Sequence, residues 1–447
     1  MARISQSADQ APTFIDLFSG CGGLSLGLCQ AGWKGVFAVE RASDAFSTFE
    51  ANFLSEGSRY PFEWPSWLEK KAHSIDDVLD LHATELQALK GSIDLIAGGP
   101  PCQGFSFAGK RNVSDPRNRM FERYVRIVAL VQPKFLVLEN VPGMSVAHRR
   151  TDSRSSGVKT FYEKLLEALH EIDYVASGVV LDASRFGVPQ RRPRLVVVGM
   201  RSDVAKNHPS GSTGVFPWIA QAGAEQMAAF TKSPHVSAKE AISDLRVGTG
   251  TNRERKTKKY TRIDSRPGFR QLKYKQPETP FQKAMNNGVA AVDMDSMRLA
   301  NHRVEVEKRF QQILRQCRKG VNLSATDREK LEMLKHRTVP MAPGAPAPTL
   351  TTLPDDILHY KEPRILTVRE CARLQSFPDW FVFKGKYTTG GDRRRIDCPR
   401  YTQVGNAVPP LLARAIGIGL MRSLEIGLIS ASPVEPGCSI GGNSKRP

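Results

Sequence analysis

The fold is decided by residues 14–23, Phe14-Ile15-Asp16-Leu17-Phe18-Ser19-Gly20-Cys21-Gly22-Gly23, which predict a buried strand, a glycine-rich turn and the start of a helix. Glycine allows a ligand to approach the backbone closely, and the start of a helix offers free N–H groups. The spacing differs from the G-x-G-x-x-G pattern of dinucleotide sites, because Ser25 stands in place of the third glycine. The turn therefore predicts a ligand site and disfavours a NAD-dependent enzyme.

The alternation of strands and helices continues to residue 200, which is typical of a parallel α/β sheet. The predicted strands are 13–18, 36–40, 93–98, 135–139 and 195–200, and a helix is predicted at 121–132. The first four strands end at the glycine turn, at Glu40, at Pro100-Pro101-Cys102 and at Glu139-Asn140-Val141. Ligands bind at the carboxyl ends of the strands in open parallel sheets, so we expect these residues to meet in one crevice.

The charge of the chain indicates its partner. Its 447 residues include 64 Lys and Arg against 45 Asp and Glu, a formal net charge of +19. This surplus favours a polyanionic partner, nucleic acid before membrane, although a generically basic soluble protein would carry the same charge.

Hydropathy and cysteine content indicate where in the cell the protein works. No apolar run approaches the ~18–20 residues of a membrane span, and the polar start lacks a signal-peptide core, so we expect a cytoplasmic protein without membrane contact. The seven cysteines are scattered and form no C-x-x-C pair. This argues against a disulfide framework and a structural zinc site, and we expect no metal.

Residues 201–360 differ from the preceding part of the chain, because their hydrophobic residues show little periodicity and Gly, Pro and Ser are frequent. They contain 27 Lys and Arg against 16 Asp and Glu, and residues 253–275 alone hold ten basic residues against two acidic ones. We expect an inserted, irregular domain that faces nucleic acid, with Lys256, Lys258 and Lys259 as DNA contacts. Regular helices are predicted again at 367–376 and 411–423, and residues 426–447 are expected to form a flexible tail.

A cysteine, a carboxylate and several arginines converge on the predicted crevice. Cys102 lies on a constrained turn after a strand, Glu139 ends the neighbouring strand, and Gln190-Arg191-Arg192-Pro193-Arg194 precedes another. A lone cysteine is more often a small buried hydrophobe, but this position exposes it to the crevice. A thiolate can add to C6 of cytosine and so make C5 nucleophilic, a carboxylic acid can hold ring N3, and arginine can hold O2. The target base must be rotated out of the duplex for this chemistry.

These blocks, in this order and spacing, resemble the C5-cytosine DNA methyltransferases across nearly the whole chain. To those already quoted the resemblance adds a loop with Gly109-Lys110-Arg111, the helix 369–378 (RECARLQSFP) and the block 403–409 (QVGNAVP). It implies a Rossmann-like, S-adenosylmethionine-dependent methyltransferase domain with a mostly parallel sheet and helices on both faces, formed by residues 12–200 and 361–425. A smaller, irregular target recognition domain is implied at 201–360. It also implies double-stranded DNA as substrate and a cognate restriction or defence system as partner, and we expect a monomer.

The resemblance implies a role for each matching residue. Cys102 would attack C6, Glu139 would engage N3, and Arg192 and Arg194 would steady the flipped base. Phe18 would stack on the adenine and Glu40 would bind the ribose. The remaining cofactor contacts would be Gly20, Gly22, Gly23, Leu24, Ser74, Ile75, Pro101, Met120 and Asn406. Residues 103–120 would close over DNA, with contacts from Gln103, Ser106, Lys110 and Arg111.

Two positions depart from the pattern of the family. Many members place an aspartate against the adenine amino group where this chain has Ser74, unless the alignment slips and Asp76 serves. Many also carry an aromatic residue after the ribose-binding acid, where this chain has Arg41.

Two other functions share these motifs. An RNA cytosine methyltransferase of the tRNA-directed branch would carry a Cys-Phe-Thr signature in the variable domain, which is absent here. A catalytically inactive DNA-binding relative would have lost its nucleophile or its acid, whereas Cys102 and Glu139 are both present. The recognised DNA sequence, and the choice between restriction, phage defence and an orphan role, do not follow from the sequence.

Overall fold

The computed structural model describes residues 11–101, 120–145, 159–208, 211–247, 270–272, 274–290, 294–389 and 397–431. Its central sheet has six strands in the order β2-β1-β3-β4-β6-β5. The strands are β1 (Thr13–Leu17), β2 (Lys34–Val39), β3 (Leu95–Gly98), β4 (Phe135–Asn140), β5 (Tyr174–Asp182) and β6 (Pro193–Arg201). Strands β1 to β4 pair in parallel, and β6 runs antiparallel to both β4 and β5.

The sheet departs from the sequence prediction in one respect. Strand β5 was missed, because it lies at the sheet edge and most of its residues are half-buried or exposed, so its pattern shows no clean alternation. Strand β6 is antiparallel to β4, and the sheet is mostly parallel, as expected. The short connection from β5 to β6 allows only an antiparallel pair, because a parallel pair needs a crossover of a dozen or more residues.

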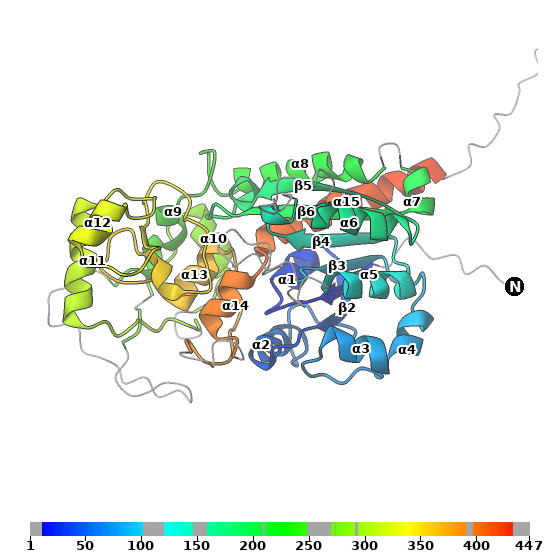
Figure 1. Ribbon diagram of the computed structural model, residues 1–447, viewed down its shortest axis with the longest axis horizontal. Coiled ribbons are helices and arrows are strands. Elements are labelled where there is room, and N and C mark those ends of the chain that lie inside the picture. Colours follow the sequence, from blue (N-terminus) through cyan, green and yellow to red (C-terminus); the bar gives the residue numbers. More distant parts are fainter. Residues whose placement is uncertain are drawn as a thin grey trace, which may run out of the picture.

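Helices cover both faces of the sheet, which occupies the right half of Figure 1. Inward-facing residues alternate along each strand, so that Phe14 and Val137 join one hydrophobic cluster and Ile15 and Leu138 join the other. The first cluster includes α1 (Gly23–Gln30), α2 (Ser43–Phe53), α8 (Val215–Ala228) and α15 (Pro410–Ala431). The second includes α3 (Ile75–Leu81), α4 (Ala83–Ala88), α5 (Met120–Val131) and α6 (Phe161–His170).

The C-terminal helix α15 returns to pack against α1 near the start of the chain. A Cβ at Gly27 would lie 2.3 Å from the Pro410 carbonyl oxygen, and Trp33 Nε1 donates to Gly417 O at 2.9 Å. Two distant chain segments therefore build one domain. The helix extends to Ala431, so the tail begins later than the expected residue 426, and residues 432–447 lie outside the described part.

Among the described residues, one stretch, 400–425, is long and apolar enough to cross a membrane, with a mean hydropathy of 1.3. Its window is 78% buried inside the protein. The apolar surface of this stretch is therefore used for packing in the core.

The smaller domain, in the left half of Figure 1, contains more helix than the sequence predicted. Its elements are α9 (Ala238–Ile242), α10 (Pro280–Asn286), α11 (Val304–Gln316), α12 (Ala325–Lys330), β7 (Val339–Pro340) and β8 (Ile357–Leu358). Helix α11 buries only Phe310 and Ile313, so its apolar stripe is too narrow to stand out in the sequence.

The first residues of the interval 201–360 lie with the sheet. Helix α7 (Ser202–Lys206) follows β6 directly, and α8 packs on α15, where a Cβ at Gly419 would lie 2.5 Å from Ile219 Cγ1. Residues beyond the expected boundary at 200, through the end of α8 at Ala228, therefore pack with the larger domain.

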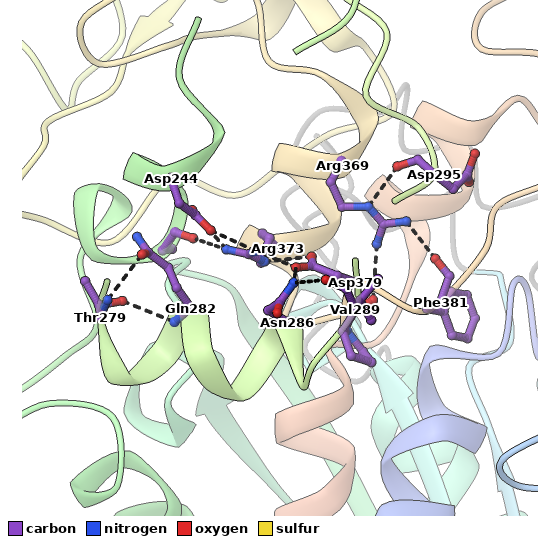
Figure 2. A network of polar contacts seen from close by, with 12 residues as sticks. Asp244, Thr279, Gln282, Asn286, Val289, Asp295, Arg369, Arg373, Asp379 and Phe381 are labelled. Atoms are coloured by element: carbon purple, nitrogen blue, oxygen red, sulfur yellow. Dashed lines mark hydrogen bonds and ion pairs between the residues drawn. The ribbon is translucent and has the colours of Figure 1, made fainter. Parts of the chain in front are cut away.

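Helix α13 (Val368–Leu374) joins the smaller domain to the rest of the chain through a buried polar network. Arg373 donates to both Asp244 and Asp379, and Arg369 donates to the backbone carbonyls of Asp295, Pro378 and Phe381. Figure 2 shows Arg369 and Arg373 extending from α13 to these partners, with Gln282 and Asn286 of α10 nearby. We call the residues Asp244, Asp295, Arg369, Arg373 and Asp379 the α13 network.

Candidate active site

The carboxyl edge of β1 and β2 is held together by Glu40. Its Oε2 accepts from Gly20 N at 2.9 Å and its Oε1 accepts from Ala42 N at 2.7 Å. Burial raises the pKa of Glu40, and these two backbone hydrogen bonds oppose that rise. Each carboxylate oxygen accepts one hydrogen bond from the backbone, so each has a lone pair left for a ligand hydroxyl.

The glycine turn has the conformation and the space that a ligand site needs. Gly20 and Gly22 adopt positive φ angles of 56° and 93°, and Phe18 before them has φ 61°, which is uncommon for a residue with a side chain. A Cβ at Gly20 would meet nothing within 4 Å, whereas one at Gly23 would lie 2.3 Å from Val408 O. Open space therefore borders Gly20, and Gly23 allows the C-terminal segment to approach the turn.

Two of the expected cofactor contacts can act only through their backbone. Leu24 and Ile75 are 3% and 4% exposed and belong to the two hydrophobic clusters. Met120 starts α5 and packs partly on the second cluster, and Asn406 is exposed at the end of α14 (Arg400–Asn406). Pro101 is exposed at the end of the β3 segment.

Asp16 is a buried carboxylate on β1 that the sequence analysis did not select. Its Oδ2 accepts from Ser25 Oγ at 2.5 Å, and its Oδ1 has no hydrogen-bond partner among the described residues. Burial raises the pKa of Asp16 to about 7. The signal was present in the sequence, because an aspartate inside the apolar strand Phe14-Ile15-Asp16-Leu17 requires a polar reason.

The structure separates the two candidates for the adenine contact. His73 N donates to Glu40 O at 2.9 Å, which places Ser74 beside the end of β2. Ser74 caps α3 and accepts from Asp77 N at 3.0 Å. Asp76 faces α5, where Arg123 Nε donates to its Oδ1 at 2.5 Å. Ser74 is therefore the residue beside Glu40, and Asp76 is engaged elsewhere.

The segment that leads into Cys102 lies against Glu139. Asn140 Nδ2 donates to Pro100 O at 3.0 Å, and a Cβ at Gly99 would lie 3.5 Å from Glu139 Oε2. Arg194 Nε lies 2.8 Å from Glu139 Oε1, and the two side chains are 11% and 10% exposed. This ion pair lacks hydrogen-bond geometry, so Glu139 Oε1 has no hydrogen bond among the described residues. The structure therefore brings Glu139 and Arg194 together beside the turn that precedes the cysteine.

Arg192 does not point at the same place as Arg194, contrary to its expected contact with the flipped base. It is 2% exposed and donates to the carbonyl oxygens of Leu350, Gly405 and Ala407 at 3.3, 2.9 and 3.0 Å. The carbonyls that end a helix lack intrahelical donors, and Arg192 supplies donors where α14 ends. These hydrogen bonds hold the segment around Asn406 against the residues that precede β6.

The remaining expected residues lie outside the described part of the chain. They are Cys102, Gln103, Ser106, Lys110, Arg111, Lys256, Lys258 and Lys259. Within the described ranges, no group of three or more His, Cys, Asp and Glu side chains could hold a metal ion.

The sheet with four parallel strands, its two helical layers and its polar carboxyl edge define a Rossmann-like methyltransferase fold. Residues 12–422 match the sequence profile of the C-5 cytosine-specific DNA methylases. The chain belongs to this family, and its activity is methylation of DNA at C5 of cytosine.

Individual relatives agree with this assignment. The chain is 32% identical to the type II methyltransferase M.DdeI of Desulfomicrobium norvegicum, over 94% of this chain and 91% of that protein. It is 31% identical to the type II methyltransferase M.XorII of Xanthomonas oryzae pv. oryzae, over 93% and 85%. Among solved structures, a putative DNA modification methyltransferase encoded within an E. coli prophage superposes with a TM-score of 0.59 at 24% identity, over 93% of this chain and all of that one.

Proposed function

We propose that the methyl donor is S-adenosylmethionine and that it binds at the carboxyl edge of β1 and β2. Three observations support this fit: the open space at Gly20, the free lone pairs of Glu40, and the buried Asp16 Oδ1, which has no hydrogen-bond partner among the described residues. When bound, the donor supplies an electrophilic methyl group on a sulfonium. Glu40 would hold the ribose hydroxyls, Phe18 would pack on the adenine, and Ser74 would meet its amino group.

We further propose that Cys102 is the nucleophile. Its thiolate adds to C6 of a cytosine rotated out of the duplex, and electron density moves toward N3 and C5. A proton held by Glu139 at N3 would neutralise the charge that develops there. After C5 is methylated, C5 loses its proton, the C5–C6 double bond returns and the thiolate leaves.

The contact between Glu139 and Arg194 carries this proposal. Both side chains are about nine-tenths buried. Because their ion pair lacks hydrogen-bond geometry, each can still form a hydrogen bond with the base. Arg194 would hold the O2 edge of the base while Glu139 engages N3. The hydrogen bond from the Asn140 side-chain amide to Pro100 O holds the Pro100-Pro101 segment beside Glu139, and Cys102, the next residue in the sequence, would act from there.

The smaller domain, from about residue 229 to 360, would choose the DNA sequence. Its basic segment 253–275 would bind the phosphates, with Lys256, Lys258 and Lys259 among the contacts. The loop 103–120 would close over DNA through Gln103, Ser106, Lys110 and Arg111. We propose that the enzyme works in the cytoplasm as a monomer and, like its type II relatives, beside a restriction endonuclease of the same DNA site.

A trapping experiment tests the mechanism. DNA from cells that express the protein is sequenced after bisulfite treatment to find the methylated site, and a duplex with 5-fluorocytosine at that position is incubated with enzyme and S-adenosylmethionine. A covalent adduct is expected, because fluorine at C5 cannot leave as a proton. An adduct that persists in Cys102→Ser, or no adduct with an enzyme that methylates the normal duplex, would remove Cys102 from the mechanism.

A further inference from the structure

The C-terminal end of α14 lies against the glycine turn that follows β1. A Cβ at Gly23 would lie 2.3 Å from Val408 O, so the two backbones touch there. Cys21 Sγ also donates to Gln403 O at 3.7 Å. Residues 403–408, which we call the α14 end, therefore border the turn whose open space is the proposed cofactor site.

Side chains from outside α14 hold the carbonyl oxygens of the α14 end. Arg192 donates to Gly405 O at 2.9 Å and to Ala407 O at 3.0 Å. Gln375, at the end of α13, donates to Val404 O at 2.7 Å. The carbonyls in the last turn of a helix generally lack intrahelical donors, so these side chains supply the bonds that keep this backbone in place.

Arg192 holds this backbone with a buried charge. Its side chain is 2% exposed, and its guanidinium hydrogen bonds in the described part of the chain all go to backbone carbonyl oxygens. Arg373, by comparison, has Asp244 and Asp379 as anionic partners. An apolar side chain would be buried at lower cost, but it could not donate to the carbonyls. The donors that Arg192 supplies to the α14 end therefore account for its burial.

Arg192 and Arg194 serve different ligands although they are two residues apart. Arg194 lies 2.8 Å from Glu139 at the proposed base site, whereas Arg192 reaches the α14 end. We propose that Arg192 is a positioning residue of the cofactor site, which holds the α14 end against the glycine turn and so keeps Asn406 beside the bound cofactor. This inference rests on the proposed binding of S-adenosylmethionine at the carboxyl edge of β1 and β2.

The full-length Arg192→Lys variant tests this, because lysine keeps the charge but lacks the fork that reaches two carbonyls. In calorimetric titration, S-adenosylhomocysteine, the demethylated cofactor, should bind with a Kd about tenfold above that of wild type. The KM for S-adenosylmethionine should rise to a similar extent, while the methylation rate at saturating cofactor should stay within about threefold of wild type. Affinity for the target duplex without cofactor should not change, because Arg192 does not contact the base.

Arg369→Lys is the matched control. Arg369 is also fully buried, and its guanidinium also donates to backbone carbonyl oxygens, but it lies in the α13 network. This variant should lose as much thermal stability as Arg192→Lys and bind S-adenosylhomocysteine like wild type. Gln375→Leu removes another donor to the α14 end without touching Arg192, and it should raise the Kd of S-adenosylhomocysteine about threefold.

Wild-type affinity for S-adenosylhomocysteine in Arg192→Lys would overturn the proposal. So would a lower rate at saturating cofactor with an unchanged KM, which is the behaviour of a base contact, or an equal loss of cofactor affinity in Arg369→Lys. If Arg192→Lys does not fold, Gln375→Leu decides, and wild-type affinity in that variant would reject the inference. Glu40→Gln tests the proposed function separately: if it binds S-adenosylhomocysteine like wild type, the cofactor does not bind at this edge.

Discussion

Two buried arginine–carboxylate contacts in this protein use the same chemical groups differently. In the α13 network, Arg373 is fully buried and uses every guanidinium N–H on Asp244, Asp379 and the Ala241 carbonyl. At the sheet edge, Arg194 approaches Glu139 to 2.8 Å without hydrogen-bond geometry, and both side chains are about a tenth exposed. In the α13 network, every N–H of Arg373 is used in a hydrogen bond within the protein. At the sheet edge, Glu139 and Arg194 can still form hydrogen bonds with a substrate.

The difference shows how to distinguish a structural ion pair from a catalytic one. Removing one partner of a saturated buried pair leaves an uncompensated charge and destabilises the fold. Removing a group that can still form a hydrogen bond with the substrate mainly removes its stabilisation of the transition state, and so lowers the rate. The two contacts should therefore respond to mutation in different measurements.

The largest expected effect is on turnover, in Glu139→Gln. The amide cannot give a proton to N3, so single-turnover methylation should slow by about 10²–10⁴ while DNA binding without cofactor stays close to wild type. Asp203→Asn, which loosens the partly exposed Arg201–Asp203 pair, should methylate at the wild-type rate. An unchanged rate in Glu139→Gln would show that Glu139 is as structural as Asp379.

The next effect is on stability, in Arg373→Met. Asp244 and Asp379 would lose their shared partner, and the free energy of unfolding should fall by about 3–5 kcal/mol in urea denaturation. Lys71→Met, in an exposed pair with Glu69, should cause no measurable change. If Arg373→Met unfolds like wild type, the α13 network is not the saturated contact that the geometry indicates.

A smaller effect concerns pH and Asp16. Burial raises the pKa of Asp16 in the folded protein to about 7, whereas its ordinary value is 3.8. Its contribution to the free energy of unfolding is therefore complete below pH 3.8 and is lost as the pH rises through 7. Relative to Asp16→Asn, wild type should lose about 2 kcal/mol of unfolding free energy between pH 5 and pH 8. Ser25→Ala removes the hydroxyl that lowers this pKa, so it should move the loss to higher pH. Parallel urea-stability curves for wild type and Asp16→Asn would contradict the assignment.

The smallest effect concerns the adenine contact. Ser74→Asp keeps a side chain able to cap α3 and adds a charged acceptor, so the demethylated cofactor should bind about threefold tighter in calorimetric titration. Arg41→Ala should weaken binding to a similar extent, because a guanidinium plane can pack on a purine. Asp76→Ala should have little effect, since Asp76 pairs with Arg123. Loss of binding in Asp76→Ala would make Asp76 the adenine ligand.

Much of the site could be predicted because its motifs are local. The glycine turn, Glu40 and Glu139 each end a strand, and the carboxyl ends of parallel strands meet at one edge wherever the sheet folds. Asp16 could have been found by the same reasoning, because an acid inside an apolar strand is costly without a function. The role of Arg192 could not, because two arginines two residues apart carry the same sequence signal.

The sheet domain, the polar carboxyl ends of its strands, the basic charge and the family motifs in their order could all be read from the amino-acid sequence. These properties follow from short periodic patterns and from residues a few positions apart. The pairing of β5 with β6, the placement of α8 and α15 in one layer, and the partners of Arg192 and Arg373 became evident only in the folded structure. Those contacts join groups well over a hundred residues apart or depend on which face of an element is buried. Only packing of the whole chain settles the direction of such a side chain.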